Sequence, residues 1–126
     1  MKPTGIRKFL PGIAWFFIIC FLVFLPGKDV PSLGWMDNLQ IDKFVHAFLF
    51  FMLILFFYAP FYKIASSAKQ RKNSLILLCI AGVIWGISIE FIQKYYVPGR
   101  SFDLWDWAAD SFGIALAFLF ARRYIR

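Results

Sequence analysis

The residues of this 126-residue chain that could do chemistry are polar side chains in three short stretches of an otherwise apolar sequence. They are Asp42, Lys43 and His46, then Glu90 and Gln93, then Arg100, Asp103, Asp106 and Asp110. A histidine oriented by a carboxylate can act as a general base, and Arg and Lys side chains can hold a phosphate group. We predict acid–base roles for His46, Glu90 and Asp106, and ligand-binding roles for the other six residues.

A divalent cation is an alternative ligand for the same carboxylates. Oxygen-rich groups with few nitrogens suit Mg²⁺ or Ca²⁺ better than Zn²⁺. The chain contains no HExxH, GxSxG or P-loop signature, so no catalytic motif selects one chemistry over another. We expect no cofactor beyond such a cation, and its protein ligands stay unassigned.

A purely structural interpretation of these residues is also open, because ion-pair networks gather charged side chains in the same way. Asp103 could cap a helix, where a carboxylate also complements the helix dipole. Arg100 could pair with the neighbouring aspartates, and Lys43 could extend its ammonium to the membrane interface. His46, four residues after Asp42, could be a hydrogen-bonded core histidine.

The segments that must position these residues are four apolar runs. The chain is 61% hydrophobic and 17% charged, whereas about 25% of the residues in a soluble domain are charged. The runs cover about 11–25, 44–62, 74–96 and 104–120, each near the roughly 17–25 residues that cross a bilayer as a helix. We predict an all-α integral membrane protein, a bundle of four transmembrane helices that forms a single domain over residues 1–126.

The charged residues predict the direction in which the helices cross. Lys and Arg gather before the first run, between the second and third, and after the fourth, and all seven acidic residues lie on the other side. Because cytoplasmic loops carry an excess of Lys and Arg, we predict that both termini are cytoplasmic. The formal charge of +7 then reports topology and gives no support to nucleic-acid binding. Anionic inner-leaflet lipid is the partner that suits these clusters.

Helical spacing predicts that the polar stretches face one another. Small residues precede Glu90 and follow Asp110 at helical spacing, namely Gly82, Gly86, Gly113 and Ala117. Small residues mark close helix contacts in a bilayer, so these faces point into the bundle, where a membrane tolerates ionisable groups. We expect His46, Glu90, Arg100 and Asp106 to meet in an outward-open polar pocket.

The same stretches resemble the VanZ-like membrane proteins. "DKFVHAFLFF" from Asp42 and "IEFIQKYYVPGRSFDLWDWAADSFG" from Ile89 are similar to that family's Asp-Lys-x-x-His, its Glu-x-x-Gln, and its Arg followed by spaced acids and a glycine. The resemblance covers about residues 40–126 and implies the four-helix fold and the nine polar residues as the functional group. The chain departs from the family at Asp110, where Asn is usual, and at Ala117, where Gly is common.

The resemblance also implies a class of function, because the family is named for a protein associated with resistance to the glycopeptide teicoplanin. We expect a multi-pass cell-membrane protein whose outward pocket engages a lipid-linked or phosphate-bearing molecule of the cell envelope. The alternative is a small membrane enzyme that uses His46 with Glu90 or Asp106 as acid and base on a lipid head group. A third alternative is a passive helper that packs against a larger envelope protein.

Overall fold

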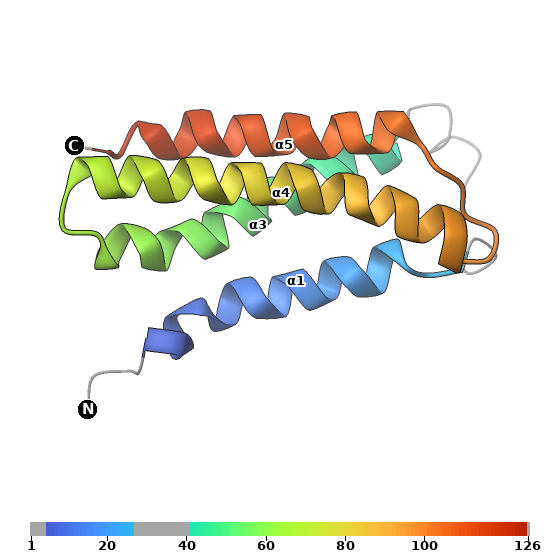
Figure 1. Cartoon of the computed structure of the whole chain (residues 1–126), viewed down its shortest axis with the longest axis horizontal. Coiled ribbons are helices and arrows are strands. Elements are labelled where there is room, and N and C mark those ends of the chain that lie inside the picture. Colours follow the sequence, from blue (N-terminus) through green and yellow to red (C-terminus); the bar gives the residue numbers. More distant parts are fainter. Residues whose placement is uncertain (1–4, 27–40, 126) are drawn as a thin grey trace.

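The architecture is an all-helical bundle, seen in a computed structural model that describes residues 5–26 and 41–125. The elements are the 3₁₀ helix η1 (Gly5–Phe9) and the α-helices α1 (Leu10–Val23), α3 (Ile41–Ile64), α4 (Ala68–Tyr96) and α5 (Leu104–Arg122). α3, α4 and α5 pack together with alternating direction, and α1 lies against α3 (Figure 1). Within the described residues, four helical segments are long and apolar enough to cross a membrane, with η1 and α1 forming one of them.

Local capping explains where the later helices begin. The Ser67 hydroxyl accepts a hydrogen bond from the backbone N–H of Gln70 at 3.2 Å, at the start of α4. The Asp103 carboxylate accepts one from the backbone N–H of Trp105 at 2.9 Å, at the start of α5. Each bond satisfies a backbone donor that the first helical turn leaves free. The turn between the two helices includes Gly99 at φ 73°, a left-handed conformation that glycine adopts at little cost.

Small residues bring the helix backbones together, as the sequence predicts. A Cβ atom added to Gly113 of α5 would overlap the backbone carbonyl of Ala47 in α3. A Cβ atom on Gly82 of α4 would lie 3.0 Å from the Ile114 side chain, and one on Gly86 would lie 3.2 Å from the Asp110 carboxylate. The buried core lies between these helices, and the faces that carry the polar stretches point into it.

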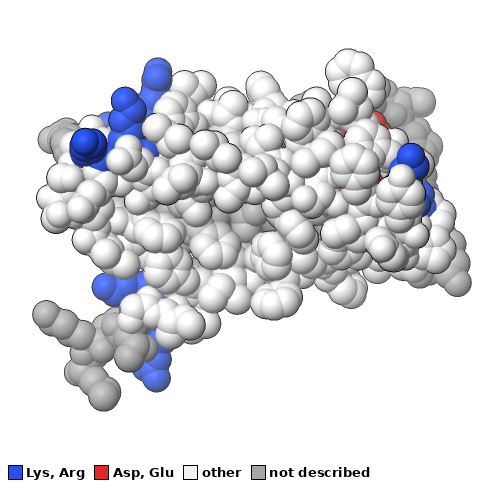
Figure 2. All heavy atoms as spheres, in the orientation of Figure 1, with Lys and Arg blue, Asp and Glu red and all other residues white. Residues whose placement is uncertain are grey.

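The charges separate along the bundle. Figure 2 shows a large group of basic side chains at one end of the molecule, and at the opposite end the visible acidic side chains with a smaller group of basic ones. The basic end holds η1, the connection from α3 to α4, and the end of α5 (Figure 1). The acidic end also carries a few basic residues, namely Lys43, Lys94 and Arg100. Four charged residues used in the topology prediction lie outside the described part of the chain: Lys2, Asp29, Asp37 and Arg126.

Candidate functional site

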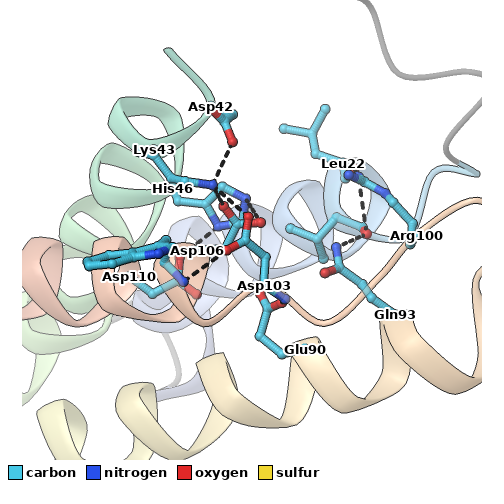
Figure 3. A network of polar contacts seen from close by, with 12 residues as sticks. Leu22, Asp42, Lys43, His46, Glu90, Gln93, Arg100, Asp103, Asp106 and Asp110 are labelled. Carbon is cyan, nitrogen blue, oxygen red and sulfur yellow. Dashed lines mark hydrogen bonds and ion pairs between the residues drawn. The ribbon is translucent and has the colours of Figure 1, made fainter. Parts of the chain in front are cut away.

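The centre of the acidic end is the Lys43 ammonium, in the first turn of α3. Its Nζ donates to the Asp42 carboxylate at 2.9 Å and to the Asp103 carboxylate at 2.8 Å, and it also contacts Asp106 Oδ1 (Figure 3). Asp103 and Asp106 come from the start of α5, so this contact ties α3 to α5. The Lys43 side chain is 21% exposed, which makes the pairs stronger than fully solvated ones.

His46 lies one turn deeper in α3 and is enclosed by two carboxylates. Its Nδ1 is 2.8 Å from Asp110 Oδ1, and its Nε2 is 3.8 Å from Asp106 Oδ2. Because a carboxylate only accepts, Nδ1 is the donor to an ionised Asp110, and Nε2 is left facing Asp106. A buried carboxylate therefore orients the imidazole, as general-base catalysis requires, and the sequence prediction that His46 meets Asp106 is confirmed.

Glu90 of α4 is fully buried beneath the start of α5. Its Oε2 accepts a hydrogen bond from the backbone N–H of Asp103 at 2.9 Å. It lies six residues before the end of α4 at Tyr96, a depth of roughly 9 Å at about 1.5 Å of rise per residue. Within the described residues, neither Glu90 Oε1 nor Asp110 Oδ2 has a hydrogen-bond partner. Buried polar atoms normally have one, so the cluster keeps unused capacity to accept hydrogen bonds.

Arg100 does not join this cluster, and the prediction that it meets His46, Glu90 and Asp106 is wrong. Its Nε donates to the Leu25 carbonyl at 3.0 Å and its Nη2 to the Leu22 carbonyl at 3.3 Å. The last carbonyls of a helix lack hydrogen-bond donors within the helix. At the end of α1 the Arg100 guanidinium supplies these donors. Among the described acidic residues, none forms an ion pair with Arg100.

Gln93 also serves the end of α1. Its Nε2 donates to the Val23 carbonyl at 2.6 Å, and its side chain is buried. Gln93 and Arg100 therefore hold α1 against the rest of the bundle, beside the acidic cluster (Figure 3). The first apolar run carries no polar motif of its own, so no specific signal in the sequence predicted this contact.

Lys43 has the pairing role that the sequence suggested for Arg100. Three carboxylates hold its ammonium, and the alternative in which this ammonium extends to the membrane interface stays a prediction. Asp103 has two roles, since it caps α5 and binds Lys43. Burial is the largest single effect and raises the pKa of Asp103, but the hydrogen bonds from Lys43 and from the backbone N–H of Trp105, together with the Lys43 charge, outweigh it, so the pKa lies below the ordinary value. The capping carboxylate therefore stays ionised at neutral pH.

Among the described residues, no group of three or more His, Cys, Asp or Glu side chains could hold a metal ion. The position that a cation would take among Asp42, Asp103 and Asp106 is filled by the protein's own Lys43 ammonium. The buried carboxylate oxygens of the cluster that have no hydrogen-bond partner among the described residues are Glu90 Oε1 and Asp110 Oδ2.

Comparison with known proteins finds a relative of unstated activity. No family model matches the chain, and no solved structure matches it. Uncharacterized protein C11E3.10 of Schizosaccharomyces pombe is 34% identical over 102 residues, which are 81% of this chain and 54% of that protein. The chain therefore spans about half the length of this relative, whose printed name states no activity.

Proposed function

We propose that this chain is a multi-pass protein of the cell membrane with both termini cytoplasmic and its acidic end facing outward. Support comes from the separation of charge along the bundle, because no acidic residue lies at the basic end of the described chain. An excess of Lys and Arg marks the cytoplasmic side of membrane proteins. The acidic cluster then opens to the space in which the cell envelope is built.

At this end the protein engages a cell-envelope ligand, and one observation carries this proposal. Three helices place His46, Glu90, Asp106 and Asp110 together, and two of their buried carboxylate oxygens have no partner in the described chain. Ionisable groups inside a membrane are costly and mark functional sites by default. A network that served stability alone would be expected to satisfy its own buried oxygens.

The resemblance to VanZ-like proteins suggests which phenotype to examine. By that resemblance, engagement of the ligand alters tolerance to glycopeptides such as teicoplanin. A phosphate clamp made of Lys43 and Arg100 has less support, because Lys43 is paired with carboxylates and Arg100 with α1 carbonyls. Of the two expected ligand types, lipid-linked and phosphate-bearing, we therefore propose the lipid-linked one.

A second candidate function is acid–base catalysis on a lipid head group. The geometry of His46 favours it, because a buried Asp110 orients Nδ1 while Nε2 faces Asp106. Such an arrangement allows a proton to be accepted and returned at Nε2. Asp106 lies at the start of α5, where the site approaches the surface of the bundle.

The test is a comparison of phenotype with protein abundance. Asp106→Asn keeps shape and hydrogen bonding but removes charge, and His46→Gln keeps polarity but removes titration. We expect both variants to insert and accumulate at normal levels in a host that lacks its own copy, and to lose glycopeptide tolerance. Lys94→Gln, an exposed residue at the same end, is the control and keeps tolerance.

Two other results would reject the proposal. If abundance falls in step with tolerance in both variants, the cluster is structural. If both variants keep full tolerance, the cluster is not the site. A chelator added to the same assay separates a metal-dependent site from one that uses side chains alone, since only the former loses tolerance.

A further inference from the structure

A groove on the membrane-facing surface leads to the acidic cluster. It lies between the first halves of α3 and α5 and has a volume of about 250 Å³. Three alanines make it hollow, namely Ala47, Ala108 and Ala109. The aromatic residues that flank it are largely exposed, with Phe44 at 72%, Trp105 at 75% and Phe112 at 60%. In a membrane such a surface faces lipid chains, so the groove has the lining that one chain requires.

The groove is continuous with the cluster through one residue. Lys43 lines the groove, and its ammonium binds Asp42, Asp103 and Asp106. A molecule with its chain in the groove would thus place its polar end beside these carboxylates. A surface patch that merely faced lipid would have no such connection to ionisable groups.

The charge of the cluster indicates which polar end fits. Five carboxylates face one ammonium and one imidazole, so acidic groups outnumber cationic ones even when His46 is protonated. Asp42 and Asp103 are the accessible ones, with side chains 58% and 38% exposed. Like charges repel and opposite charges attract at such short range, so an amine is favoured over an anionic head group.

We propose that this groove binds one chain of an amine-bearing membrane lipid, whose ammonium lies at Asp42 and Asp103. The inference rests on the proposed function, because it names the ligand class of the same cluster. The lipid enters sideways from the leaflet at the acidic end, without passing through the aqueous phase. Its chain supplies contact area along α3 and α5, and its head group supplies selectivity.

Native mass spectrometry of the purified protein with two competing lipids tests this inference. The probes are phosphatidylethanolamine and phosphatidylglycerol with identical acyl chains, so that only the head group differs, an ethanolamine that carries an ammonium in one and an uncharged glycerol in the other. We expect the protein to retain phosphatidylethanolamine over phosphatidylglycerol by about tenfold, equivalent to about 1.4 kcal/mol. Equal retention of both lipids, or a preference for phosphatidylglycerol, would overturn the assignment of the head group.

Variants separate the groove from the head-group site. Ala108→Leu fills the groove and should lower retention of both lipids by about tenfold. Ala115→Leu is the matched control, because Ala115 lies seven residues further on the same exposed face of α5, outside the groove. The double variant Asp42→Asn, Asp103→Asn should keep lipid but lose the preference for the amine. Retention by Ala108→Leu equal to that by Ala115→Leu would overturn the groove assignment.

The folding of each variant, its lipid selectivity and its glycopeptide tolerance are measured separately. Circular dichroism and thermal unfolding confirm that each variant is folded, and Trp105→Ala, which removes one side of the groove, provides a second test if Ala108→Leu unfolds. Normal lipid selectivity together with full tolerance in Asp106→Asn would defeat the proposed function and leave the lipid site standing. Loss of tolerance in Asp106→Asn with no lipid selectivity in the native protein would defeat the lipid site and leave the proposed function standing.

Discussion

At the scale of single residues, the positive charge of Lys43 allows several acidic side chains to lie close together in the cluster. It lies between three carboxylates from two helices, so without it these groups would repel one another at short range. The sequence predicted the acidic members of this cluster and His46, but it also placed Arg100 there, in the pairing role that Lys43 has. Arg100 is adjacent to the aspartates in sequence, yet its guanidinium reaches the end of α1. Spacing along one chain segment does not reveal carbonyls that a distant helix leaves unpaired.

Removing the Lys43 charge should therefore destabilise the bundle. Lys43→Met keeps the length of the side chain, and we expect it to lower the free energy of unfolding by about 1–3 kcal/mol. This is below the cost of stranding fully buried charges, because the Lys43 side chain is 21% exposed. Adding Asp106→Asn to Lys43→Met removes one of the carboxylates left without its cation, and it should recover at least about 0.5 kcal/mol of the lost unfolding free energy. Unfolding in mixed micelles measures both values, and equal stability of Lys43→Met and the native protein would contradict this role.

At the scale of helices, close approach of α3 and α5 positions the cluster. Hydropathy predicted that these helices exist, and the small-residue stripe predicted which faces meet. Hydropathy did not predict the helix ends well, since the expected apolar runs began at about 44 and 74 whereas the helices begin at Ile41 and Ala68. The first turn of α4 is polar and is held by the Ser67 cap. Helix ends follow from hydrogen bonding, which an apolar run does not report.

Gly113 should be the residue that tolerates least change in this contact. In Gly113→Ala the new Cβ would overlap the Ala47 backbone, which cannot rotate away as a side chain can. We expect a loss of about 1–3 kcal/mol in unfolding free energy, typical of overpacking. Gly5→Ala is the control, because no other atom lies within 4 Å of its added Cβ. If both variants unfold alike, backbone contact at Gly113 does not position the cluster.

The attachment of α1 should be separable from the cluster. Arg100→Met removes the donors to the Leu22 and Leu25 carbonyls while leaving the contacts of His46 in place. Loss of charge-assisted hydrogen bonds worth about 1.5 kcal/mol should speed amide exchange near residues 22–25 about tenfold. Hydrogen exchange measures this change, and the imidazole resonances of His46 should stay where they are. A shifted imidazole signal would show that Arg100 belongs to the cluster after all.

At the scale of the whole molecule, the separation of charge predicts the direction of insertion. A single cysteine is introduced at position 69, in the first turn of α4 at the basic end, or at position 101, in the turn at the acidic end, after Cys20 and Cys79 are replaced by Ser. A membrane-impermeant thiol reagent added to intact cells should label position 101 and spare position 69. Both residues are exposed, so accessibility does not bias the comparison. Labelling of position 69 alone would invert the proposed topology and place the cluster in the cytoplasm.

The central claim is that the acidic cluster engages a ligand, and a structure of the protein in membranes from its own host tests this most directly. An antibody fragment would make a particle large enough for cryo-electron microscopy. The account predicts non-protein density in the groove beside Ala108, reaching to within about 4 Å of the Asp42 and Asp103 carboxylates. Density of protein alone, with Glu90 Oε1 and Asp110 Oδ2 accepting hydrogen bonds from neighbouring protein groups, would contradict it.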